Sequence, residues 1–272
     1  MSSRDVLRAE ATEKGWKVRT TPFFADSPLV DGVEDSGFTW IRRHFALISV
    51  FSERPASSSP LDSSFDWKDQ PGVVGTPRDQ GMKNATCMAH AACAVAEARS
   101  VLGSGSMEFS PRYLHFCAMQ QDRQSPPRIE KLANTLLKNG FPVTSEGEEL
   151  DDMASCRAIS DVTWSKASAA YRFWKADDVK REISRHGPVL AIMDLREDFL
   201  NWYTGTDVYR ATPSSPVIGR HAVCFVGYDD AEQCWIGMNS LGPGWGDGGF
   251  FKIGYEDSGV LTPYAIYSFD MA

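Results

Sequence analysis

The chain has 272 residues, enough for one large domain or two smaller lobes around a sizeable core. Its hydrophobic fraction of 42% and charged fraction of 24% are ordinary for a globular protein and exclude a chain that is disordered throughout. A formal net charge of −8 provides no general field that would attract DNA, RNA or an anionic membrane. We therefore expect neither a nucleic-acid partner nor a membrane partner.

The first 19 residues alternate charged and small side chains and lack the uninterrupted apolar core of a secretory signal. This absence predicts a cytoplasmic chain, with export by another route left open. The longest apolar run, residues 45–51, is too short for a membrane helix and is typical of a buried strand.

The six cysteines are even in number, so disulfides are conceivable, but their mostly apolar surroundings and the missing secretory signal favour free thiols. We expect one reactive thiol and five buried free thiols. No CxxC pair or tight Cys/His cluster is present, so we expect no metal and no cofactor. The reactive thiol is Cys87, and the five core thiols are Cys93, Cys117, Cys156, Cys224 and Cys234.

The N-terminal quarter of the chain differs from the remainder. Residues 1–36 predict a short helix followed by an extended arm, and the β-branched and aromatic run at 37–51 predicts a strand or hairpin. The Ser/Pro-rich stretch 54–64 has no apolar period and predicts a linker. We therefore divide the chain into an N-terminal extension, 1–64, and a main body, 65–272. The extension is either a removable pro-segment or a fixed arm.

In the main body, helical patterns come first and strand patterns follow. Helices are predicted after Cys87, after the Ser110-Pro111 start signal, at 129–139 and at 177–183. Strands are predicted at 189–193, 222–228, 234–239, 250–255 and 264–269. This order indicates an α+β fold in which a helical lobe faces a β-rich lobe.

Cys87 precedes an alanine-rich helical stretch and therefore lies at or near a helix N-terminus. Free backbone N–H groups and the positive end of the helix dipole stabilise a thiolate there, which makes the thiol a better nucleophile. A lone cysteine in such a helix is more often part of the packing, so the interpretation requires a base. His90, three residues further along the same helix, points along the helix and is more simply explained by packing.

Two later segments provide the missing groups. His221 opens an apolar strand, and Asn239 ends a strand before a glycine-rich turn. An imidazole on one strand and an amide on its neighbour can form a hydrogen bond, which fixes the tautomer that faces the thiol. Alone, His221 would more often be a core histidine and Asn239 a turn residue. The two residues indicate a catalytic site only through their joint spacing, because His221 follows Cys87 by 134 positions and Asn239 follows it by 152.

With these motifs the chain resembles the papain-like cysteine peptidases, in which His and Asn follow the cysteine by roughly 130–150 residues. The resemblance covers about residues 65–269. Within the family, the chain resembles bacterial members. The matching motifs are DQG at 79–81, HAV at 221–223, VGY at 226–228, NS at 239–240 and GPGWGDGG at 242–249.

The resemblance implies a two-lobe fold with Cys87 on the helical wall of a cleft and His221 on an antiparallel β-rich wall. It implies that Cys87 is the nucleophile, His221 the base and then the acid, and Asn239 the residue that orients the imidazole. Gln80 would complete the oxyanion hole with the Cys87 backbone N–H, although Gln80 could also simply cap the helix. Trp245 would shield the Asn239 to His221 contact. The implied substrate is a peptide or protein.

Several positions depart from the family pattern. Asn84 and Met88 replace a cysteine and an aromatic residue around the nucleophile, and residues 123–127, with two prolines, replace a glycine pair that binds substrate backbone. Leu241 stands where the family usually has tryptophan. Candidate substrate-binding residues are Arg220, Ser125 and Met88. For Arg220 and Ser125, contact with the substrate and an ordinary surface position are equally good interpretations.

The main functional hypothesis is a hydrolase of peptide or amide bonds that forms a thioester on Cys87. The altered residues near the cysteine motivate an alternative, an acyl transferase or peptide ligase in which an amine resolves the same thioester. A third possibility is a non-catalytic binding module with the same fold. All four expected catalytic positions hold residue types that can function, which argues against that module.

Overall fold

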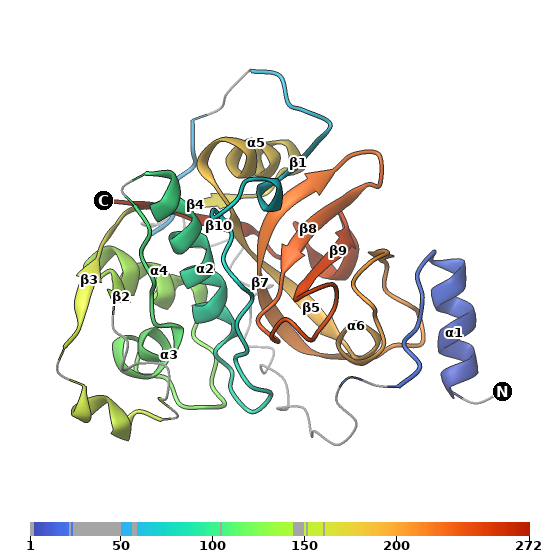
Figure 1. The fold of residues 1–272 in the computed structure, drawn as a ribbon, viewed down its shortest axis with the longest axis horizontal. Coiled ribbons are helices and arrows are strands. Elements are labelled where there is room, and N and C mark those ends of the chain that lie inside the picture. The colour runs from blue at the N-terminus through green and yellow to red at the C-terminus, as the bar shows by residue number, and fades with distance from the viewer. Residues whose placement is uncertain are drawn as a thin grey trace, which may run out of the picture.

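The computed structural model describes residues 3–21, 23, 50–55, 59–103, 105–143, 150, 152–159 and 161–272. Helices α2, α3 and α4 gather on one side of the molecule, and strands β7, β8 and β9 with helix α6 lie on the other (Figure 1). The predicted α+β fold, with a helical lobe beside a β-rich lobe, is therefore confirmed. The strand or hairpin expected at 37–51 falls almost wholly outside the described residues.

Helix α2, Cys87–Leu102, is the central helix of the structure. Its small side chains allow close approach, so Ala89, Ala92 and Ala96 have no exposed surface and the helix packs against strands of the β lobe. Helix α4, Ile129–Lys138, buries one face through Ile129, Leu132 and Leu136. Helix α3, Pro111–Tyr113, starts at the predicted Ser110 cap and continues into a π-helical turn, Leu114–Ala118.

The remaining helices are short or peripheral. In the described part of the chain they are α1, Ser3–Glu13; α5, Ala176–His186; α6, Glu197–Asn201; and 3-10 turns at Trp67–Asp69, Ala154–Ala158 and Asp257–Gly259.

One large sheet carries the β lobe, in the order β4-β10-β5-β7-β8-β9-β6, and β1 also pairs with β7. Neighbours are antiparallel except for the parallel pair β6 and β9. The strands are β1, Ser64–Asp66; β4, Ala167–Phe173; β5, Val189–Arg196; β6, Val208–Tyr209; β7, Val217–Asp229; β8, Cys234–Met238; β9, Phe250–Gly254; and β10, Ile266–Met271. A separate pair joins β2, Phe141–Val143, to β3, Thr163–Ser165.

The predicted strands are confirmed, although β7 begins five residues before the predicted start, at Val217. The buried part of β7 starts at His221, which is where the apolar pattern becomes visible in the sequence. Gly227 lies where β1 pairs closely with β7. A Cβ at this position would stand 2.3 Å from the Phe65 carbonyl oxygen, so only glycine fits there. Strand β4 was not predicted because it is an edge strand whose buried and half-exposed positions do not alternate cleanly.

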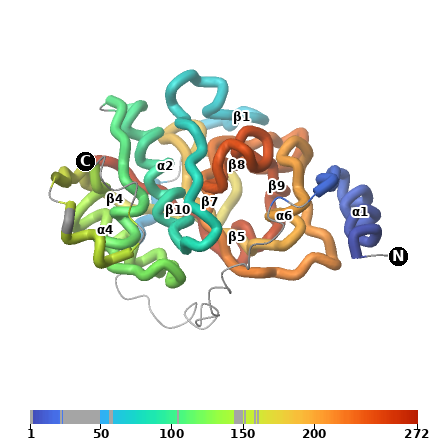
Figure 2. The backbone as a smooth tube through the Cα atoms, turned by 60° about the horizontal axis from the view of Figure 1, so that its bottom comes forward, coloured from blue at the N-terminus to red at the C-terminus, as the bar shows by residue number. Residues whose placement is uncertain are grey.

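The described parts of the N-terminal extension pack on the body at two separate places. Trp16 is buried against the rings of Tyr203 and Tyr209, and its indole N–H donates to the Arg210 carbonyl at 2.9 Å. Residues 50–55 run beside β4, where the Ser52 N–H donates to the Ala170 carbonyl at 2.9 Å. Figure 2 shows α1 at the β-lobe end of the molecule.

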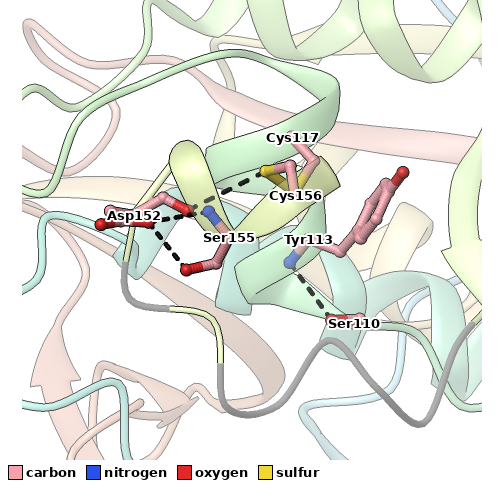
Figure 3. The surroundings of a disulfide bond; sticks show 6 residues. All are labelled: Ser110, Tyr113, Cys117, Asp152, Ser155 and Cys156. Carbon is pink, nitrogen blue, oxygen red and sulfur yellow. Dashed lines mark hydrogen bonds between the residues drawn. A yellow bond between two sulfur atoms is a disulfide. The ribbon is translucent and has the colours of Figure 1, made fainter. Parts of the chain in front are cut away.

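A disulfide joins Cys117 to Cys156, so the prediction that both are free core thiols is wrong. Figure 3 shows that the bond connects the π-helical turn after α3 to the 3-10 turn at Ala154–Ala158. The two cysteines are 39 residues apart, and only tertiary packing brings them together. The other four, Cys87, Cys93, Cys224 and Cys234, are buried and are not part of a disulfide.

Disulfides persist in oxidising compartments. The Cys117–Cys156 bond therefore shows that apolar surroundings and the missing secretory signal were not sufficient grounds for predicting free thiols, while the cytoplasmic location itself stays a prediction. Among the described residues, no helix is both long and apolar enough to cross a membrane.

Candidate active site

Cys87 is the first residue of α2 and is buried against β7. Burial by itself raises the pKa of this thiol. The hydrogen bond and the charge of His221 lower it more strongly, aided by backbone N–H groups of Ala222 and Met88, so the pKa lies below its ordinary value of 9.0. The geometry therefore favours the thiolate of Cys87.

His221 lies on β7, facing the start of α2, and is buried. Burial lowers the pKa of the imidazole, but the hydrogen bond and charge of Cys87, together with the hydrogen bond to Asn239, raise it above its ordinary value of 6.5. Its Nε2–H donates to the Asn239 Oδ1 at 2.7 Å, which leaves Nδ1 for the thiol. Two segments 134 residues apart thus bring the thiol and the imidazole together, and the directions of their pKa shifts favour a thiolate beside an imidazolium.

Asn239 follows the last residue of β8, and its backbone N–H donates to the Gly249 carbonyl at 2.9 Å. The Asn239 Oδ1 accepts from the Ser240 backbone N–H at 2.8 Å as well as from His221. These contacts fix the amide with its oxygen toward the imidazole. The structure therefore brings Cys87, His221 and Asn239 together as the sequence predicted.

Gln80 is buried in the turn before α2, and its side chain is held at both ends. Its Oε1 accepts from the Ser240 hydroxyl at 2.5 Å, and its Nε2 donates to the Asn84 carbonyl at 2.8 Å. The Asn84 side-chain amide in turn donates to the Gln80 carbonyl at 2.9 Å. Because a side-chain amide nitrogen carries two hydrogens, one N–H of Gln80 is left for a ligand oxygen.

Sequence reasoning missed the contribution of Ser240 and Asn84 to this arrangement. Ser240 stands directly after Asn239 in the NS motif, so the signal for it was present but had no assigned role. Asn84 was noted only as a missing disulfide partner. In the structure it closes a reciprocal pair of hydrogen bonds around Gln80.

A cavity of about 110 Å³ adjoins Cys87 and His221. Its wall is mainly apolar and includes Met88, Pro126, Pro127 and Ile192. The predicted substrate-binding residue Met88 therefore does lie beside the nucleophile, in a wall that favours an apolar group.

Arg220, the second predicted binding residue, also lines this cavity. Its Nε–H donates to the Tyr264 hydroxyl at 3.0 Å, and that hydroxyl donates to the Asp194 carboxylate at 2.7 Å. Ser125, the third candidate, is exposed, does not line the cavity, and donates its hydroxyl to Asp122 at 2.9 Å.

Trp245 lies in an aromatic cluster of the β lobe. Its ring packs against Phe199 and Phe251, and its indole N–H donates to the Leu200 carbonyl at 3.0 Å. Its shielding of the Asn239 to His221 contact stays a prediction.

His90 does not compete as a base. It is buried, its Nδ1 lies 3.0 Å from the Thr86 carbonyl oxygen, and burial lowers its pKa to about 3. Among the described residues, no group of three His, Cys, Asp or Glu side chains lies close enough together to hold a metal ion.

The fold and this site agree with what comparison with known proteins finds. The model of the papain family of cysteine proteases matches residues 61–267, and the chain belongs to that family.

Among curated relatives, cathepsin B-like CP3 of Giardia intestinalis is 26% identical over 213 residues, covering 72% of this chain and 70% of that protein. Tubulointerstitial nephritis antigen of Bos taurus is 37% identical over 90 residues, which are 28% of this chain and 18% of that protein. The match to the bovine protein thus spans less than a fifth of its length.

Solved structures share the fold. Procathepsin B S9 of Trypanosoma congolense superposes with a TM-score of 0.78 at 18% identity, covering 100% of this chain and 99% of that chain. Xylellain, a cysteine protease of Xylella fastidiosa, superposes with a TM-score of 0.65 at 19% identity, covering 82% and 91%. The expected papain-like two-lobe fold is thereby confirmed.

Proposed function

We propose that this chain hydrolyses peptide bonds of a peptide or protein substrate through a thioester on Cys87. The observation that carries the proposal is the hydrogen bond of 2.7 Å between His221 and Asn239, with the imidazole turned toward the thiol. The opposite pKa shifts of Cys87 and His221 support the same assignment. Family membership makes peptides and proteins the substrate class.

In the first step, the Cys87 thiolate adds to the carbonyl carbon of the scissile peptide bond and a tetrahedral oxyanion forms. His221 then protonates the leaving amine, the C–N bond breaks, and a thioester remains on Cys87. A water molecule, deprotonated by His221, attacks the thioester and releases the carboxylate. Asn239 keeps the imidazole ring in one orientation throughout.

The oxyanion needs donors that are already in place before the reaction. Gln80 Nε2, fixed through Ser240 and Asn84, can supply one N–H, and the Cys87 backbone at the start of α2 can supply the other.

Labelling with an epoxysuccinyl thiol probe tests the proposal. Wild type is expected to bind one equivalent at Cys87, with loss of peptide hydrolysis. Cys87→Ala should lose both labelling and activity. Cys93→Ala, which removes a buried thiol that is not part of a disulfide from the same helix, is the matched control and should keep both. Hydrolysis that persists in Cys87→Ala would overturn the proposal.

Analysis of the products formed by the wild-type protein distinguishes hydrolysis from acyl transfer to an amine. Mass spectrometry of products formed with and without an added amino acid amide is expected to show the hydrolysed acid as the main product in both. A dominant amide product would assign the alternative function instead.

A further inference from the structure

A second, larger cavity of about 520 Å³ lies outside the candidate active site. Its walls come from the C-terminal end of β4, from α5, and from residues 53–55 of the N-terminal extension. It shares no lining residue with the cavity beside Cys87. Helix α5 lies at the top of the molecule in Figure 1. The proposed peptide hydrolysis gives this cavity no role.

The lining of this cavity is rich in cations although the chain as a whole is acidic. Four basic side chains, Arg172, Lys175, Arg181 and Arg185, line it, together with two carboxylates, Glu53 and Asp178. An excess of positive charge within one concave site favours an anion.

Two further lining residues, Arg54 and Glu182, neutralise each other. Their Nε and Oε2 atoms lie 2.6 Å apart, and the Glu182 side chain has no exposed surface. The Arg54 guanidinium also lies 3.8 Å from the centre of the Tyr171 ring. This pair therefore adds no net charge, but it fixes the extension in place as one wall, so the cavity exists before any ligand arrives.

One of the four cations has a donor without a partner. The Nε–H of Arg181 is buried, and among the described residues no acceptor meets it, while Nη1 of the same group lies 3.4 Å from Asp178. This Nε has less than 1 Å² of exposed surface, so a ligand in the cavity does not reach it directly. The Nη groups of Arg181 are therefore the ones that can bind an anionic oxygen there.

From these observations we propose that the cavity between β4, α5 and residues 53–55 binds a small ligand that carries two or more phosphate or sulfate groups. Arginine forks bind such groups through paired N–H donors, and Lys175 adds a point charge at the exposed rim. A single site of this volume accommodates several anionic groups, and the four cations line it.

Isothermal titration of the full chain with inorganic tripolyphosphate and, separately, with sucrose octasulfate tests the proposal. One equivalent is expected to bind, more weakly as salt is added. Lys175→Ala and Arg181→Ala should each weaken binding about tenfold, which is the scale of one charge-assisted contact. Lys131→Ala and Lys138→Ala on α4 are matched controls outside the cavity and should bind as wild type does.

Binding of tripolyphosphate alone would assign a phosphorylated ligand, and binding of sucrose octasulfate alone a sulfated one. Lys175 is exposed, so Lys175→Ala decides the question if Arg181→Ala does not fold. The proposal is overturned if neither compound binds, or if the cavity variants and the α4 controls bind equally. Cys87→Ala should bind both compounds as wild type does, because the cavity lies apart from the nucleophile.

Discussion

At the scale of single residues, the candidate active site depends on two groups that change each other's protonation. Burial acts against the charged form of both Cys87 and His221, and their mutual contact, together with backbone N–H groups at Cys87 and Asn239 at His221, more than offsets it. The pair is therefore a coupled system, and the pKa values seen in an experiment belong to the pair rather than to either group.

We predict a bell-shaped pH dependence of kcat/KM. The reaction requires thiolate and imidazolium together, so the rate rises as Cys87 loses its proton and falls as His221 loses its own. The rising limb should lie below the ordinary thiol pKa of 9.0, and the falling limb above the ordinary imidazole pKa of 6.5. Alkylation of Cys87 by iodoacetamide, followed by mass spectrometry across pH, reports the thiolate directly.

His221→Ala tests the origin of that profile. Without the imidazole, burial dominates, so the pKa of Cys87 should rise and alkylation at neutral pH should slow. His90→Gln, which alters a buried neutral histidine of the same helix, should leave the alkylation profile unchanged. An unshifted profile in His221→Ala would refute the pairing.

Asn84 is predicted to act as a positioning residue for Gln80. Asn84→Ala removes the donor to the Gln80 carbonyl and loosens the turn before α2, so kcat should fall about fivefold, the scale of one lost hydrogen bond of about 1 kcal/mol, with little change in KM. Lys83→Ala, at the exposed neighbouring position, is the control. A rise in KM at constant kcat would instead place Asn84 in substrate binding.

The proximity of Cys87, His221 and Asn239 was predictable because several motifs agreed in order and spacing. Cys87, His221 and Asn239 each have an ordinary structural interpretation alone, and only their joint spacing selects the chemical one. The Ser240 to Gln80 contact could not be predicted in this way, because it joins two motifs 160 residues apart through side-chain geometry. The position of Ser125 could not be predicted from the sequence either. It does not line the cavity, because the local turn directs its hydroxyl to Asp122.

At the scale of elements, the predictions succeeded where a segment is buried on a regular period. Helix α4 shows a clear apolar face, and the buried half of β7 is a continuous apolar run. Strand β4 lies at an edge of the sheet and has a mixed pattern, so periodicity alone could not identify it. Pairing of Cys117 with Cys156 likewise depends on how two short turns meet in space, which no local pattern records.

We predict that the Cys117–Cys156 bond stabilises the helical lobe. It closes a loop of 39 residues, and the chain-entropy model assigns such a loop about 4 kcal/mol of unfolding free energy. The double variant Cys117→Ala/Cys156→Ala should therefore unfold at a lower temperature, by roughly 10 °C for a chain of this size. Differential scanning fluorimetry measures the shift.

Reductant provides the internal control for this prediction. Wild type should lose the same stability when dithiothreitol is added, whereas the double variant should not respond. Equal melting temperatures for wild type and the double variant, both without reductant, would contradict the prediction.

At the scale of the whole molecule, the N-terminal extension and the body share a buried ionic network. Arg54 and Arg99 both bind Glu182, at 2.6 and 2.7 Å, and both bind Asp270, at 2.6 and 2.9 Å. Ser268 adds a hydrogen bond to Glu182 at 2.7 Å. Two cations thus balance two carboxylates, and one of the cations comes from the extension.

Arg54→Met should therefore destabilise the whole body. The change leaves two carboxylates facing a single arginine, and breaking one partner of a buried ion pair costs about 3 kcal/mol. Urea denaturation monitored by tryptophan fluorescence gives the loss of unfolding free energy. Glu53→Gln, an exposed neighbour on the same segment, is the control and should lie within about 0.5 kcal/mol of wild type.

The same network constrains how much of the extension can be a removable pro-segment. Removing residues 50–55 would delete both the backbone pairing with β4 and the Arg54 partner of Glu182, so the body should retain these residues even if the chain is cut. The Trp16 contact on the β lobe is separate from this network and carries no such constraint. Intact-mass analysis of the thiol-labelled, active protein over time is expected to show no species that begins after residue 55. A stable, fully active species that begins at residue 59 or later would show that the body does not need Arg54.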